Sequence, residues 1–99
     1  MKTIGETLRE LRESKKFLLR EVGAELSIDP TLLSKIERNE RMPTKEQVLL
    51  LSNFYKENKD DVIKAWISDK LVYEIQDEEF GLDALRLAEQ KVKYKIGKK

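Results

Sequence analysis

The chain has 99 residues, a formal net charge of +1 and a charged fraction of 39%. The length fits one domain with a small core, and a charged fraction well above the roughly 25% of ordinary globular proteins favours a helix-rich, solvated surface. The chain has no cysteine and no histidine, which excludes disulfides and thiolate chemistry and removes the commonest general base and metal ligand.

The first two expected helices are short and amphipathic. Thr3 can cap the first, and its apolar face recurs at helical spacing with Ile4, Leu8 and Leu11. The second is expected over 19–26. Gly23 in its interior costs about 1 kcal/mol relative to alanine, which indicates that another backbone packs closely there.

A third short helix begins at Pro30. Asp29 is a good N-cap and Pro30 a good first helical residue. Asn39 can adopt the left-handed conformation that ends a helix. The inward face is expected to carry Leu33 and Ile36, and the more outward positions are Thr31, Leu32, Ser34 and Lys35.

Three further helices are expected. Thr44–Gln47 is a capping box that starts the fourth, Asn58 caps a fifth over 59–76, and a sixth runs from about Leu82. No strand-like alternation occurs, so the fold class is all-α. No apolar run approaches the roughly 18 residues of a membrane span, and the charged N-terminal segment is unlike a signal peptide. We therefore expect a soluble, cytoplasmic protein.

Two short helices joined by a three-residue turn form a helix-turn-helix. Residues 4–62 resemble the lambda-repressor and Cro-like family, also called the xenobiotic-response-element type, through the segments IGETLRELRESKK, VGAELSIDPTLLSKIERNERMPT and QVLLLSNFY. The family's alanine before the turn falls at Gly23, its turn glycine at Ser27 and its glutamate at Glu37. The resemblance implies a lambda-repressor-like helix-turn-helix bundle with two extra C-terminal helices, whose third helix enters the major groove of double-stranded DNA.

The resemblance also assigns roles to side chains. Thr31 and Lys35 become the leading base-reading residues, and Leu32 could meet a thymine methyl group. The expected backbone contacts are Ser34, Arg38 and Arg41, with Lys45 and Arg20 as weaker ones. Each of these side chains has the alternative of an ordinary solvated, capping or locally ion-paired role. Arg12 and Glu37 are expected to form a structural ion pair.

Two positions depart from the family pattern. Many relatives carry a phosphate-binding glutamine where this chain has Leu19, so that contact is absent or is replaced by Arg20 or by backbone amides at the helix start. The first reading position is Pro30, which has no donor, so one base contact is lost.

Residues 1–63 are expected to form the DNA-binding domain and residues 64–99 a C-terminal helical extension. One reading helix recognises too few base pairs to select a genomic site, and such proteins usually bind paired half-sites as two-fold dimers. The extension is a candidate dimerisation element through Trp66, Ile67, Leu71, Leu85, Ala88 and Val92. The alternative is that these residues enlarge the core of the monomer.

The expected function is a sequence-specific transcription regulator that binds a palindromic operator as a homodimer. A repressor or autoregulator is favoured because so short a chain leaves no room for an effector domain, and a restriction-modification controller is one such subtype. The alternatives are an antitoxin or protein-interaction module whose last helices bind a partner protein, and a structural helical adaptor. No nucleophile, metal or phosphate-loop spacing is present, so we expect no enzymatic activity, cofactor or metal.

Overall fold

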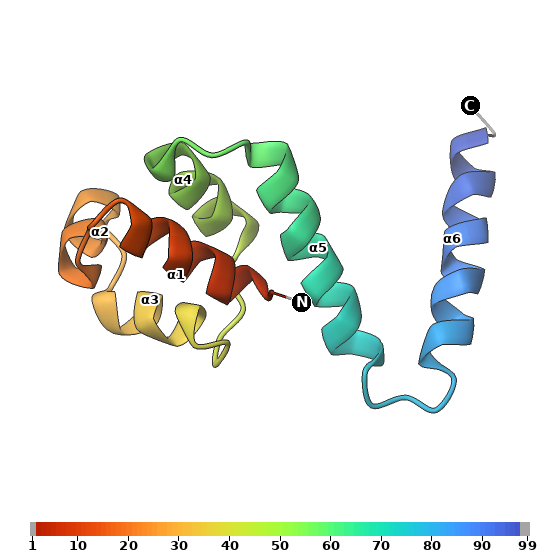
Figure 1. The fold of residues 1–99 in the computed structure, drawn as a ribbon. Coiled ribbons are helices and arrows are strands. Elements are labelled where there is room, and N and C mark those ends of the chain that lie inside the picture. Colours follow the sequence, from red (N-terminus) through yellow and green to blue (C-terminus); the bar gives the residue numbers. More distant parts are fainter. Residues whose placement is uncertain (1, 98–99) are drawn as a thin grey trace. The chain divides into compact units, whose positions relative to one another are not determined.

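The computed structural model describes residues 2–97, and over this range the chain forms six helices and no strand (Figure 1). The all-α prediction is therefore confirmed. The helices are α1 (Ile4–Ser14), α2 (Leu19–Leu26), α3 (Pro30–Glu37), α4 (Lys45–Tyr55), α5 (Lys59–Ile75) and α6 (Gly81–Gly97).

Side chains next to the helix starts fix where the helices begin. Thr3 Oγ1 accepts from the backbone N–H of Glu6 at 3.1 Å, and Asp29 Oδ1 accepts from the N–H of Thr31 at 2.8 Å. Thr44 and Gln47 form the reciprocal pair of a capping box, with distances of 2.9 and 3.1 Å. Each bond satisfies a backbone donor that the first turn of a helix leaves without an intrahelical partner.

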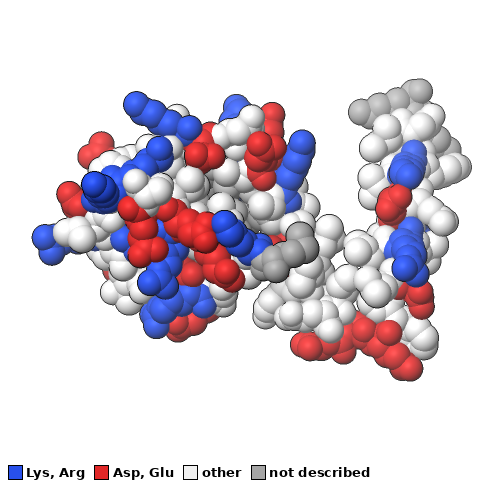
Figure 2. Space-filling view, viewed as in Figure 1, with Lys and Arg blue, Asp and Glu red and all other residues white. Residues whose placement is uncertain are grey.

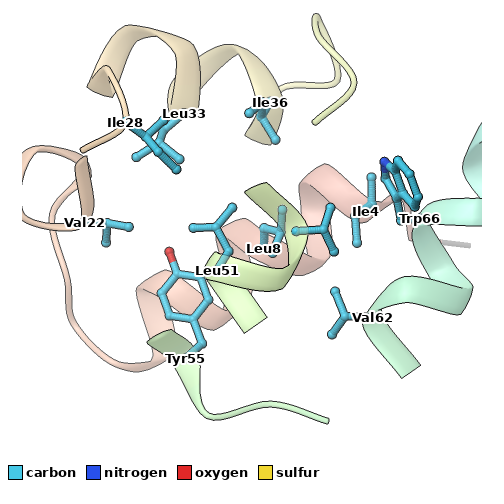
Figure 3. Close-up of a cluster of buried hydrophobic side chains, with 11 residues drawn as sticks. Ile4, Leu8, Val22, Ile28, Leu33, Ile36, Leu51, Tyr55, Val62 and Trp66 are labelled. Atoms are coloured by element: carbon cyan, nitrogen blue, oxygen red, sulfur yellow. The ribbon is translucent and has the colours of Figure 1, made fainter. Parts of the chain in front are cut away.

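The hydrophobic core lies among α1–α4 and the first half of α5 (Figure 3). It consists of Ile4, Leu8, Val22, Ile28, Leu33, Ile36, Val48, Leu51, Tyr55, Val62 and Trp66. All eleven side chains are at most 8% exposed. Because α3 contributes only one face to this core, its opposite face remains at the surface.

Helices α1 and α3 pack in close contact at Gly5. A Cβ atom at this position would overlap the backbone carbonyl oxygen of Ile36 and lie 2.6 Å from Oδ1 of Asn39. The absence of a side chain at Gly5 therefore lets the end of α3 rest directly on α1.

Two long-range hydrogen bonds join α5 to earlier parts of the fold. The indole N–H of Trp66 donates to the carbonyl of Pro43 at 2.8 Å, and the backbone N–H of Ile4 donates to Oδ2 of Asp69 at 2.6 Å. Trp66 and Asp69 both come after residue 63, the expected end of the DNA-binding domain. The chain divides into compact units at Met1–Asp69 and Lys70–Lys99, which places these contacts inside the first unit.

Candidate nucleic-acid interface

The turn between α2 and α3 is tight. Ser27 adopts a left-handed conformation with φ 55°, and the N–H of Ile28 donates to the carbonyl of Gly23 at 3.0 Å. A Cβ atom on Gly23 would lie 2.5 Å from the carbonyl oxygen of Ile28 and 3.0 Å from Cγ of Pro30. The turn therefore folds back onto α2 at the glycine, which explains why this helix accommodates a poor helix former.

Helix α3 has one buried and one exposed face. Leu33, Ile36 and Glu37 point inward and are at most 7% exposed. The exposed side chains Thr31, Lys35 and Arg38 are spaced by four and three residues, so they form one stripe on the opposite face. This stripe contains both residues expected to read bases.

Two other candidate residues lie at the sides of α3. Leu32 is half-buried and packs against the edge of the core, and Ser34 is half-buried as well. Leu32 is thus partly engaged within the protein, which leaves less of its side chain to meet a thymine methyl group.

The candidate phosphate-binding cations differ in whether they already form an ion pair within the protein. Arg20, Lys35, Arg41 and Lys45 are exposed and form no ion pair with any of the residues 2–97. Arg38 instead forms an ion pair with Glu40 at 2.8 Å, and its Nε donates to the carbonyl of Ser34 at 3.3 Å. Because the arginine already has an anionic neighbour, a phosphate would have to compete with Glu40 for it.

The start of α2 carries a residue that the sequence reasoning missed. The carboxylate of Glu21 accepts from the backbone N–H of Leu18 at 2.8 Å, so this amide is already bonded and a negative charge stands at the helix start. The spacing Leu18-x-x-Glu21 follows the second half of a capping box, a signal that was available in the sequence. Two replacements were expected for the missing glutamine, namely Arg20 and the backbone amides at the helix start. Because Arg20 is exposed and the Leu18 amide is already bonded, Arg20 is the better candidate for a phosphate contact.

A buried ion pair locks α3 onto α1. The guanidinium of Arg12 donates from Nε and Nη2 to the two carboxylate oxygens of Glu37 at 2.8 and 2.9 Å, and from Nη1 to the carbonyl of Phe17 at 2.9 Å. The hydrogen bond with Glu37 raises the pKa of Arg12, so the guanidinium of Arg12 keeps its positive charge. Burial, followed by the charge of Glu37, raises the pKa of Tyr55 to about 12.

The residues expected in a dimer interface fall into two groups. Trp66 is 8% exposed and belongs to the core, because its indole N–H reaches Pro43; it therefore does not lie on a surface open to a partner. Ile67, Leu71, Ala88 and Val92 are exposed and Leu85 is half-buried. The structure thus removes Trp66 from the set and leaves the other five available.

Among residues 2–97 no three acidic side chains gather closely enough to hold a metal ion, and none of the helices has the length and hydrophobicity needed to cross a bilayer.

A three-residue turn, a second helix with a locked inner face and a polar outer stripe, and free cations around it define a helix-turn-helix DNA-binding domain. A family model described as Helix-turn-helix matches residues 8–62, more than half of the chain. The chain belongs to the lambda-repressor/Cro-like helix-turn-helix family, and it is in general terms a DNA-binding transcription regulator. No curated protein and no solved structure was found to match it.

Proposed function

We propose that this protein is a sequence-specific, cytoplasmic transcription regulator that binds a palindromic operator as a homodimer and acts as a repressor or autoregulator. The observation that carries the proposal is the stripe of Thr31, Lys35 and Arg38 on the outer face of α3. The inner face is held by Leu33, Ile36 and the Arg12–Glu37 pair, so the outer face is presented rigidly.

The proposal divides the contacts by their chemistry. Lys35 can donate to the O6 and N7 acceptors of guanine in the major groove, and the hydroxyl of Thr31 can bond to either base edge. Arg20, Arg41 and Lys45 supply unpaired cations for phosphates, which set the position of the protein but carry no sequence information. This division predicts different effects for base-reading and phosphate-binding variants.

A dimer gives the reading helix enough specificity. One good side-chain contact to a base discriminates by about 1–3 kcal/mol, and two copies of α3 on half-sites one helical turn apart double the number of such contacts. Repression follows if the bound dimer covers a promoter, as a controller of restriction-modification genes could do for its own promoter.

The experiment is selection of bound sites from a random DNA pool, followed by anisotropy titrations on the selected and on scrambled duplexes. Lys35→Ala should reduce the preference for the selected site by about 5- to 150-fold, the equivalent of 1–3 kcal/mol. Arg41→Ala should weaken binding to both duplexes and flatten the log–log salt slope by about 0.9. Lys64→Ala, which removes the same charge from α5 outside the helix-turn-helix, is the matched control.

Two results would contradict the proposal. Wild-type protein that binds selected and scrambled duplexes equally would remove sequence specificity. A Lys35→Ala protein with unchanged preference would show that Lys35 does not read bases.

The second candidate function is a protein-interaction module that binds a partner protein through its last helices. The observation that favours it is the set of exposed apolar side chains on α6, among them Leu82, Val92 and Ile96. Sedimentation of the protein alone separates the candidates, because a homodimer has twice the mass of the chain, whereas a module awaiting another protein sediments as a monomer.

A further inference from the structure

The C-terminal unit, residues 70–97 as described, leaves a large part of its apolar side chains in solvent. Val72, Tyr73, Phe80, Leu82, Leu87, Val92, Tyr94 and Ile96 are each more than half exposed. Isolated helices of this length are marginal in water and normally gain their stability by packing an apolar face. The exposure therefore indicates a surface that another helix covers.

One face of α6 is suited to such packing. Leu82, Leu85, Ala88, Val92 and Ile96 follow one another at intervals of three, three, four and four residues, which places them on one side of the helix. Ala88 lies near the middle of the helix, and its small side chain allows a second backbone to approach closely there. We call these five residues the α6 stripe.

The charges of the C-terminal unit are separated along the chain. Glu74, Asp77, Glu78 and Glu79 precede α6, whereas Lys91, Lys93 and Lys95 lie in its second half. Figure 2 shows the acidic side chains gathered around the connection between α5 and α6 and the basic ones along α6. The unit therefore has an acidic end and a basic end.

Most of these charges have no partner within the described chain. The four carboxylates from Glu74 to Glu79 form no ion pair with residues 2–97, and neither do Lys91 and Lys95; Lys93 pairs with Glu89 at 2.9 Å. Glu74 lies in the last turn of α5, and Asp77 follows its end, where the helix dipole disfavours negative charge. A cation from outside the chain would offset this unfavourable placement.

We infer that the α6 stripe is covered by the same stripe of a second copy, with the two α6 helices antiparallel and the two-fold axis near Ala88. The inference deepens the proposed homodimer and rests on it. An antiparallel pair brings the acidic connection of each copy toward the basic end of the partner's α6, and it aligns opposite ends of the helix dipoles. A parallel pair would place acidic beside acidic and basic beside basic.

Because the chain has no cysteine, single introduced cysteines can determine the direction. Leu82 is six residues and Ile96 eight residues from Ala88, so they lie about 9 and 12 Å from the axis along the helix. In an antiparallel pair, two copies of Leu82→Cys are about 18 Å apart, and two copies of Ile96→Cys about 24 Å. Leu82→Cys and the partner's Ile96→Cys differ in height by only about 3 Å, within the reach of a disulfide, whose Cα atoms are at most about 7 Å apart.

The experiment oxidises the full-length proteins Ala88→Cys, Leu82→Cys and Ile96→Cys and an equimolar mixture of the last two, and it compares the covalent dimers on gels. We expect Ala88→Cys to cross-link with itself, Leu82→Cys and Ile96→Cys to cross-link poorly alone, and the mixture to yield the hetero-disulfide. Lys56→Cys, at an exposed position at the end of α4, is the matched control and should remain uncross-linked. These positions are exposed, so circular dichroism should show unchanged helix content.

Two results would overturn the inference. A parallel pair would be established if Leu82→Cys and Ile96→Cys each cross-linked efficiently with themselves and the mixture gave no more hetero-disulfide than random pairing predicts. A wild-type protein that sediments as a monomer, with no cross-link at Ala88→Cys, would show that the stripe is not covered by a second copy. The parallel pair would leave the proposed homodimer standing, whereas the monomer would overturn the homodimer as well. Neither result depends on DNA, so the operator titrations still test sequence specificity by themselves.

The charges allow an independent check by sedimentation. Lys91→Glu/Lys95→Glu should weaken self-association at least tenfold at low salt, because it places acidic groups opposite the acidic connection. Adding Glu78→Lys/Glu79→Lys to the same chain should restore association, since both ends are then reversed together. A charge-reversed dimer as tight as wild type, or a fourfold variant no tighter than the double one, would overturn the electrostatic pairing.

Discussion

Replacing Arg12 with methionine tests how strongly α3 depends on its ion pair with α1. The side chains of Arg12 and Glu37 are 12% and 7% exposed. Methionine has no charge and no donor, so the carboxylate of Glu37 would remain buried without a cation. Breaking a buried pair from one side costs about 3–5 kcal/mol, and the lost bond to the carbonyl of Phe17 adds about 1 kcal/mol. Because methionine still buries apolar surface, we expect a net loss of 3–5 kcal/mol, about the total stability of a marginal domain.

The assay is urea denaturation followed by the fluorescence of Trp66, the single tryptophan of the chain, which is buried in the same core. Arg12→Met/Glu37→Met should regain most of the loss, because an apolar pair of similar volume is often as stable as a buried ion pair. Arg9→Met, which removes an exposed pair with Glu13 at 3.3 Å, should change stability by no more than about 0.5 kcal/mol.

The reasoning would be refuted if Arg12→Met lost less than about 1 kcal/mol. It would also be refuted if the double variant were as unstable as the single one, because the loss would then come from packing and not from an unpaired carboxylate.

Three further predictions concern the backbone and pH. Gly5→Ala should lower the free energy of unfolding by about 1–3 kcal/mol, because its Cβ would overlap a carbonyl oxygen of α3. Gly97→Ala is the control and should not destabilise the protein, since no atom lies within 4 Å of its Cβ position; equal urea midpoints for the two variants would contradict the prediction. Ser27→Gly should raise the free energy of unfolding by about 1 kcal/mol, because φ is 55°; a lower melting temperature would count against it. Tyr55 has a folded pKa of about 12 against 10.0 in the unfolded chain, so the folded state retains a proton that the unfolded state loses. The contribution of Tyr55 to the free energy of unfolding should be fully present below pH 10 and decline by up to about 3 kcal/mol as the pH rises to 12. Identical pH dependences of the free energy of unfolding for wild type and Tyr55→Phe would disprove this.

The sequence was sufficient for features that depend on neighbours along the chain. The caps Thr3, Asp29 and Thr44 act within three residues, so the helix starts they mark could be predicted from local pattern alone. The exposure of Thr31 and Lys35 followed from the 3.6-residue period once Leu33 and Ile36 were assigned to the core.

Features that depend on distant contacts could not be predicted in this way. Trp66 and Pro43 are 23 residues apart and Asp69 and Ile4 are 65 apart, so neither bond leaves a periodic signal. For this reason the sequence pattern makes Trp66 a candidate for a dimer interface, although its side chain lies in the core. The pairing of Arg38 with Glu40 depends on side-chain conformation, which the sequence leaves open between phosphate binding and a local ion pair.

The bonds from Trp66 and Asp69 have a practical consequence for anyone who shortens this protein. A fragment cut at residue 63, where the family pattern stops, would lose the indole that bonds Pro43 just before α4 and the carboxylate that caps α1. A cut after residue 69 would keep both. We therefore expect the smallest piece able to hold its reading helix in place to run past the recognisable motif and to include the first half of α5.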